Sequence, residues 1–170
     1  IENLLSSDTK GSVAKSTGLA IILLSDAFSR LDPDVVLLIG DRSETHAAAT
    51  TAMLMNIPIA HIHGGEITEG AVDDKIRHSI TKMSSLHFTS TDEYRDRLIQ
   101  MGEQSSMVLS VGAPGIDNIV NMSLLSKVEL EGELDWQFNG TIALFTFHSE
   151  TLSKVNVRKE IKRILEIIGD

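Results

Sequence analysis

The strongest constraint on the fold is an alternation along the sequence: short apolar runs are separated by longer helical segments. The runs lie at residues 34–39, 57–62, 86–89 and 107–111. A continuous apolar run such as 34–39 is typical of a parallel strand buried on both faces. The alternation therefore predicts an α/β fold, in which helices flank a parallel sheet and the crossovers are right-handed.

The segments between these runs carry apolar residues at helical spacing. They predict helices at 11–31, 45–55, 73–84, 92–101, 114–119 and 155–168. Boundary signals support them, because Asp32-Pro33 stops the first helix and Gly102 caps the fourth. The Ala-rich segment 45–55 suits close helix packing, and we expect it to pack within its own domain rather than across a dimer.

A change of composition near residue 123 indicates a domain boundary. Residues 123–139 are acidic and have no Lys or Arg after Lys127, which suggests a linker. A strand at 141–147 and the helix at 155–168 then resemble the first unit of a second domain. We therefore expect a first domain at 1–122, incomplete at its start, and the start of a second domain at 140–170. Because Ile1 is not a natural start, we expect a fragment of a longer chain.

Composition narrows the partners and the compartment. The net charge of −9 over 170 residues argues against nucleic acid as a partner, since binding phosphates requires a basic surface. The absence of Cys excludes disulfides and fits a cytoplasmic protein. No run reaches the roughly 18 apolar residues of a membrane span, so no membrane partner is expected.

Polar residues gather directly after the expected strands. Gly40-Asp41-Arg42 follows the first strand, residues 63–66 (His-Gly-Gly-Glu) follow the second, and Asp73-Asp74 opens a helix that carries Arg77 and His78. Open α/β sheets place their ligand sites at the carboxyl ends of strands. Several acids and a His at such an edge point to proton transfer.

Each of these groups also has a simpler interpretation. Asp41 could reach a sugar or act as a base, or it could cap a helix or pair with Arg42. Gly64-Gly65 permits close approach by a ligand, while Glu66 could equally be an exposed loop acid.

Helical spacing lets Asp73 reach Arg77 and lets Asp74 reach His78, although plain capping is the alternative. Two carboxylates in one partly dry site would separate in pKa and supply one acid and one base. His61 and His63 could be metal ligands on one strand face, but a packed His61 and a turn His63 are favoured, so no metal is expected.

These residues resemble the hydrolysing UDP-N-acetylglucosamine 2-epimerases of bacterial sialic-acid and related nonulosonate pathways. The resemblance is carried by residues 40–42, 61–66, 73–74, 76–82, 88–91, 112–117 and 147–151. It implies two Rossmann-like domains in the glycosyltransferase-B arrangement, which this chain holds only in part. The family's N-terminal strand and most of its uridine-diphosphate-binding second domain are absent.

The resemblance implies that UDP-N-acetylglucosamine and water become N-acetylmannosamine and UDP. UDP would leave by elimination, and hydration of a glycal-like intermediate would invert C2. The implied acid, base and charge-stabilising groups are Asp41, Glu66 and Asp73, with Asp74 as the alternative to Asp73. Several relatives carry a catalytic Glu at the position of His63, so either His63 or Glu66 takes that role.

The remaining site residues implied by the resemblance bind or orient the substrate. They are Arg42, Gly64, Gly65, Arg77, His78 and, near the diphosphate, His148. No cofactor is implied, and a homodimer or homotetramer is expected.

Four alternatives remain open. They are a hydrolysing 2-epimerase of a UDP- or GDP-linked 2,4-diacetamido-trideoxy sugar, a non-hydrolysing epimerase, a non-catalytic nucleotide-sugar-binding module, and a metal-dependent hydrolase using His61 and His63. The His-Ile-His-Gly-Gly-Glu segment argues against the non-hydrolysing enzyme, in which a His-x-Glu-Ala-Gly segment is expected.

Overall fold

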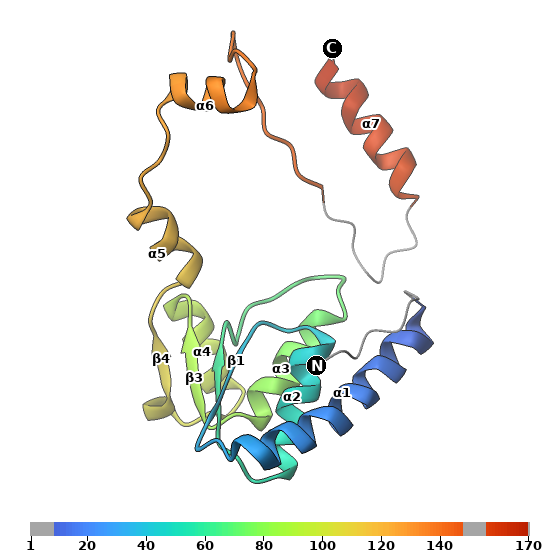
Figure 1. Cartoon of the computed structure of the whole chain (residues 1–170), viewed down its shortest axis with the longest axis vertical. Coiled ribbons are helices and arrows are strands. Elements are labelled where there is room, and N and C mark those ends of the chain that lie inside the picture. The colour runs from blue at the N-terminus through green and yellow to red at the C-terminus, as the bar shows by residue number, and fades with distance from the viewer. Residues whose placement is uncertain (1–8, 148–155, 170) are drawn as a thin grey trace. The chain divides into compact units, whose positions relative to one another are not determined.

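The computed structural model describes residues 9–147 and 156–169 (Figure 1). The chain divides into two compact units, residues 1–113 and residues 114–170. The first unit contains the sheet and every residue of the candidate site described below. The predicted domain boundary at residues 122–123 stays a prediction.

The first unit is built on a four-stranded parallel sheet. Its strands are β1 (Val36–Ile39), β2 (Ile59–Ile62), β3 (Leu86–Thr89) and β4 (Val108–Ser110), and they lie side by side in that order. The α/β class and the parallel sheet are as predicted. Because every strand runs the same way, the segments that follow the strands all emerge at one edge of the sheet.

Helix α1 (Lys10–Leu31) precedes the first strand of the first unit. Three helices connect the strands, namely α2 (Ser43–Leu54), α3 (Asp73–Met83) and α4 (Asp92–Gln100), and a short 3-10 turn at Ser105–Met107 leads into β4. The Thr9 side chain caps α1 by accepting from the Ser12 N–H, and Thr91 caps α4 by accepting from the Tyr94 N–H. The observed helix bounds lie within two residues of the predicted ones.

The register of the sheet separates a covered face from an open face. Leu38, His61, His87 and Val108 pair across the four strands and are all buried. The next row, Ile39, Ile62, Phe88 and Leu109, is half-buried or exposed.

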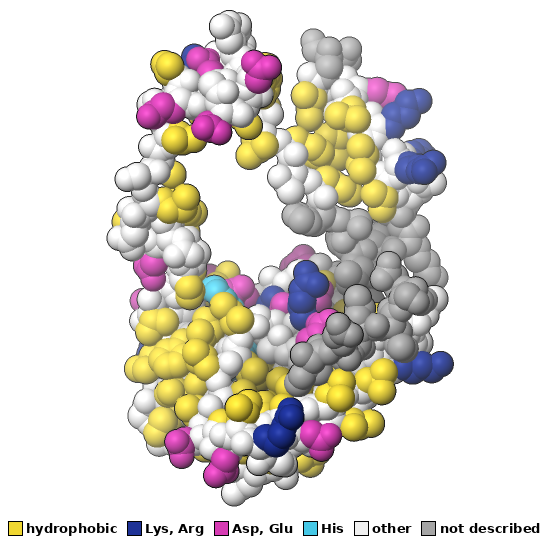
Figure 2. Space-filling model, in the orientation of Figure 1, with side chains coloured by type: hydrophobic (Ala, Val, Ile, Leu, Met, Phe, Trp, Pro, Cys, Tyr) yellow, Lys and Arg dark blue, Asp and Glu magenta, His cyan; other side chains and the backbone are white. Residues whose placement is uncertain are grey.

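The expectation that residues 34–39 are buried on both faces is therefore wrong, since Leu37 is 62% exposed and Ile39 is 58% exposed. Strand order follows chain order, so right-handed crossovers carry α2, α3 and α4 over the same face. Hydrophobic side chains consequently gather over the strands on the other face (Figure 2).

The core lies between the covered face and the helices. Ala47, Ala49 and Ala52 of α2 are fully buried, as is Ile80 of α3, and Ile59 of β2 is nearly so. Small side chains let α2 pack closely between α1 and α3, which both contact it. The Ala-rich helix thus packs within its own unit, as expected.

The second unit contains helices α5 (Pro114–Asn121), α6 (Lys127–Leu134) and α7 (Val157–Gly169). The stretch 123–139, expected to be a linker, holds α6, which a capping box between Ser126 and Glu129 begins. The predicted strand at 141–147 is wrong, because no described strand pairs with this segment, and Leu144 is 96% exposed. Across the described parts of the chain, no helix has the length and apolar character needed to cross a membrane.

Candidate active site

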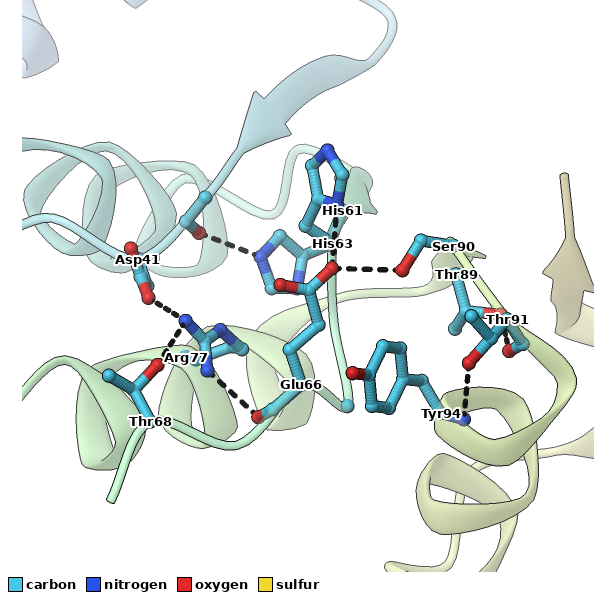
Figure 3. A network of polar contacts seen from close by, with 12 residues as sticks. Asp41, His61, His63, Glu66, Thr68, Arg77, Thr89, Ser90, Thr91 and Tyr94 are labelled. Carbon is cyan, nitrogen blue, oxygen red and sulfur yellow. Dashed lines mark hydrogen bonds and ion pairs between the residues drawn. The ribbon is translucent and has the colours of Figure 1, made fainter. Parts of the chain in front are cut away.

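The segments that follow β1, β2 and β3 meet the first turns of α3 at the carboxyl edge of the sheet. Asp41 comes after β1, His63 and Glu66 come after β2, Ser90 comes after β3, and Arg77 projects from α3 (Figure 3). Backbone turns and hydrogen bonds, described next, hold these side chains together.

Arg77 is the centre of this cluster. Its side chain is only 7% exposed and forms an ion pair with Asp41 through Nη2. Nη2 also donates to Thr68 Oγ1 at 3.1 Å, and Nη1 donates to the Glu66 carbonyl at 2.8 Å. A planar guanidinium can serve acceptors in several directions at once, so Arg77 joins the turn after β1 to the loop after β2.

Two contacts that the sequence left open are not formed. Arg77 pairs with Asp41 across the fold, and the contact with Asp73 that helical spacing allows one turn away is absent. Asp41 pairs with Arg77 and not with its neighbour Arg42, which is exposed at the start of α2. The Asp41 carboxylate retains 21% exposure, so one side of the pair still reaches solvent.

His63 and Glu66 form a second pair. His63 Nδ1 lies 2.7 Å from Glu66 Oε1, and Ser90 Oγ donates to the same oxygen at 2.9 Å. An Nδ1–H that donates to a carboxylate leaves Nε2 as the basic nitrogen of the neutral ring. Both side chains are about a quarter exposed, so part of this pair reaches solvent.

The backbone at His63 has an uncommon conformation. Its φ of +67° is a left-handed value that few non-glycine residues adopt. Such strain persists where the surroundings hold it, and it is concentrated at functional sites. His63 therefore lies in the turn that follows β2, outside the strand that holds His61.

Asp74 and His78 form the expected pair one helical turn apart, with His78 Nε2 and Asp74 Oδ1 at 3.7 Å. Asp74 Oδ1 also accepts from the Thr68 N–H at 3.2 Å, which ties the loop after β2 to the start of α3. Asp73 is half-buried, and its side chain makes no hydrogen bond or ion pair with the rest of the described chain.

Gly64 and Gly65 are buried against neighbouring protein. A Cβ on Gly64 would lie 3.2 Å from both His61 Nδ1 and Thr81 Oγ1. A Cβ on Gly65, whose φ is +83°, would lie 2.5 Å from the Tyr94 carbonyl oxygen. The packing of α3 and α4 explains both glycines, and a role in substrate binding stays a prediction.

His61 is buried on β2 and lies beneath the site. Its Nε2 lies 2.9 Å from the Gly40 carbonyl. Burial lowers the His61 pKa to about 4, although the hydrogen bond to Gly40 acts in the opposite direction. His61 is therefore neutral near pH 7.

Sequence reasoning missed part of this arrangement. The sequence marks Ser90 as part of a helix start and of a segment of family resemblance, but not as a partner of Glu66, and nothing in the sequence marks Thr68 as a partner of Arg77. His148, expected near the diphosphate, lies outside the described residues. Across residues 9–147 and 156–169, no three His, Cys, Asp or Glu side chains converge as metal ligands would.

Comparison with known proteins places these features in a family. The family described as UDP-N-acetylglucosamine 2-epimerase matches residues 1–170. The chain is 45% identical over 163 residues to the GDP/UDP-N,N'-diacetylbacillosamine 2-epimerase (hydrolyzing) of Campylobacter jejuni, covering 96% of this chain and 42% of that protein. It is 41% identical over 160 residues to polysialic acid biosynthesis protein P7 of Escherichia coli, covering 92% of this chain and 40% of that protein.

A third relative and a solved structure agree with this assignment. The UDP-N,N'-diacetylbacillosamine 2-epimerase (hydrolyzing) of Legionella pneumophila is 35% identical over 155 residues, covering 91% of this chain and 41% of that protein. The crystal structure of UDP-GlcNAc 2-epimerase from Neisseria meningitidis bound to UDP-GlcNAc matches 76% of this chain and 34% of that chain, with a TM-score of 0.64 and 25% identity.

The chain therefore spans about two fifths of the length of these curated relatives. The match over its whole length and the shared fold lead to one conclusion: the chain belongs to the UDP-N-acetylglucosamine 2-epimerase family.

Proposed function

We propose that this chain is part of a hydrolysing 2-epimerase, which converts a nucleotide-linked 2-acetamido sugar and water to the free C2 epimer and the nucleoside diphosphate. The observation that carries the proposal is the His63–Glu66 pair beside the Asp41–Arg77 ion pair at the carboxyl edge of the sheet. Relatives named as hydrolysing epimerases support the water-dependent reaction.

The reaction has two steps. In the first, the bond from C1 to the diphosphate oxygen breaks while a base removes the C2 proton, which leaves a C1–C2 double bond. In the second, hydroxide from water adds to C1 and a proton adds to C2 from the opposite face. Inversion at C2 therefore requires proton-transfer groups on two faces of the sugar ring.

The described side chains suit these roles. His63 Nε2 accepts or donates a proton while Glu66 holds the opposite nitrogen, so the two residues act as one acid–base unit. Asp73 has no partner in the described chain and supplies the second proton-transfer group. Asp41, which Arg77 holds in place, stabilises positive charge that develops at C1 as the diphosphate leaves.

For the sugar, the relatives favour N,N'-diacetylbacillosamine linked to UDP or GDP, since two of them carry this substrate in their names. UDP-N-acetylglucosamine, with N-acetylmannosamine as product, is the second candidate, because the similar solved enzyme was bound to that nucleotide sugar. Either reaction suits the synthesis of sialic acid or a related nonulosonate. A homo-oligomer and a cytoplasmic location belong to the same proposal.

Proton NMR of the full-length protein in deuterated water tests the reaction. UDP-N-acetylglucosamine and the UDP- and GDP-linked diacetylbacillosamines are supplied separately. Free sugar with deuterium at C2, together with nucleoside diphosphate, is expected from one of them. A nucleotide-linked product would instead establish the non-hydrolysing reaction.

Two variants separate catalysis from mere binding. Asp41→Asn should abolish turnover and leave nucleotide-sugar binding measurable by calorimetry. Asp96→Asn is the matched control, because Asp96 is 64% exposed and pairs only with Arg95 among the described residues. If the wild type binds the nucleotide sugars but consumes none of them, the protein is a binding module and the proposal fails.

A further inference from the structure

His61 is a polar side chain at a fully buried position, although it belongs to none of the groups assigned to the reaction. It lies in the middle of β2 on the helix-covered face, and its side chain has no exposure to solvent. A buried polar group requires a hydrogen-bond partner, because leaving it unpaired is destabilising. The identity of that partner indicates what His61 does.

The partner is the main chain directly before Asp41. His61 Nε2 lies 2.9 Å from the Gly40 carbonyl oxygen, which can only accept, so Nε2 carries the proton. Nδ1 is buried and has no hydrogen-bond partner in the described chain. Burial also lowers the pKa of the ring, so the neutral Nε2–H form persists across the working pH range.

Gly40 is consequently held at both of its polar groups. Its N–H donates to the Ile62 carbonyl at 3.2 Å, and its carbonyl accepts from His61. Gly40 has a φ of +79°, which turns the chain sharply after β1. The next residue is Asp41, whose carboxylate meets Arg77 (Figure 3). The direction of the Asp41 side chain thus depends on a backbone unit that His61 fixes.

We infer that His61 is a positioning residue that acts through the Gly40 carbonyl to place the Asp41 carboxylate for the reaction. This inference rests on the proposed function. A group displaced by about 1 Å from its productive position can lose on the order of 10²-fold in rate, so a hydrogen bond behind the site can matter as much as one within it.

Two substitutions separate the positioning role from simple packing. In full-length protein, His61→Gln places an amide N–H where Nε2 lies and keeps the bond to Gly40. His61→Asn places its amide nearer the position of Nδ1 and loses that bond. We expect His61→Asn to lower kcat roughly 10- to 100-fold with KM changed less than about threefold, and His61→Gln to recover most of kcat.

His87 provides the matched control. It pairs with His61 in the sheet and is equally buried, but its Nε2 faces Glu103 at 3.3 Å, away from Asp41. His87→Asn should lower the melting temperature about as much as His61→Asn while leaving kcat near the wild-type value. Equal loss of kcat in both variants would reduce His61 to a packing role and overturn the inference.

A double-mutant cycle tests whether His61 acts through Asp41. In the Asp41→Asn background, His61→Asn should cause little further loss of kcat, because the carboxylate that His61 positions is already gone. Additive losses from the two substitutions would overturn the proposed route.

Nitrogen-15 NMR of the wild type gives a readout that does not depend on activity. We expect the His61 signals, identified by their loss in His61→Gln, to show a protonated Nε2 and a bare Nδ1 between pH 5 and pH 8. A doubly protonated ring or a proton on Nδ1 near pH 7 would overturn the inference. Because this measurement uses the wild type, it decides the question even if His61→Asn does not fold. If the wild type consumes none of the three nucleotide sugars, the proposed function fails. If it is active and His61→Asn keeps full kcat, only this inference fails.

Discussion

Replacement of Arg77 by Met should destabilise the first unit by about 3–4 kcal/mol. Arg77 serves three acceptors, namely the Glu66 carbonyl, Thr68 Oγ1 and the Asp41 carboxylate. Hydrogen bonds from a charged donor contribute about 1.5–3 kcal/mol each, which gives an upper limit of about 9 kcal/mol. Thr68 is exposed and Asp41 reaches solvent, so water recovers much of what those two acceptors lose.

Arg77→Lys should cost about 2 kcal/mol, because one ammonium group can meet Asp41 but cannot also span the other two acceptors. Urea unfolding of the full-length protein, followed by circular dichroism, measures both values. Arg95→Met is the control, since Arg95 is 38% exposed and pairs only with the adjacent Asp96 among the described residues; about 0.5 kcal/mol or less is expected. A cost below about 1 kcal/mol for Arg77→Met would refute the view that Arg77 joins the two loops.

Three further predictions concern the same edge of the sheet. Gly65→Ala should lower the unfolding free energy by more than about 3 kcal/mol, because its Cβ would lie 2.5 Å from a main-chain oxygen of α4. Gly40→Ala is the comparison: its Cβ would meet open space, so it should cost only the 1–2 kcal/mol or so of a left-handed φ. Urea titration of both variants measures the two costs. Glu66→Gln should lower kcat about 10²-fold and His63→Gln still more, because His63 transfers the proton whereas Glu66 only orients the His63 ring. Steady-state release of nucleoside diphosphate measures both values. Wild-type activity in either variant would contradict a catalytic role for the pair. The unfolding free energy should fall by on the order of 3 kcal/mol as pH drops from about 6.5 to about 4, because unfolded His61 takes up a proton that the folded state excludes, and His61→Gln should flatten this part of the pH profile.

The sequence contains enough information to predict the sheet and its helices. Apolar runs bounded by Gly, Pro and Asp predicted the strands to within two residues, because these residues act locally on the backbone. The exposure of Leu37 and Ile39 could not be predicted in this way. A hydrophobic pattern shows that a residue suits a covered position, but it does not show whether a covering element is present. The strand predicted at 141–147 was wrong for the same reason, since a strand is stable only beside a neighbouring strand.

The site could be predicted only in outline. The strand ends located Asp41, His63 and Glu66, because parallel strands bring their carboxyl ends together. The pairing of Arg77 with Asp41 could not be predicted, since helical spacing considers only residues on the same helix and Asp41 follows strand β1. Local spacing also cannot predict that Thr68 and Ser90 complete the hydrogen bonds.

The strand order also determines how the sheet can assemble during synthesis. Each of the four strands pairs with its neighbour in the chain, so every closure spans one α-helix and the short segments that flank it. Closure entropy rises with loop length, and folding slows as contacts become more distant in sequence. Within the described residues, no strand of this sheet has to wait for a distant partner, and these four strands can pair one at a time as the chain leaves the ribosome. The loops that carry Asp41, His63 and Glu66 are then fixed in the order in which they are made.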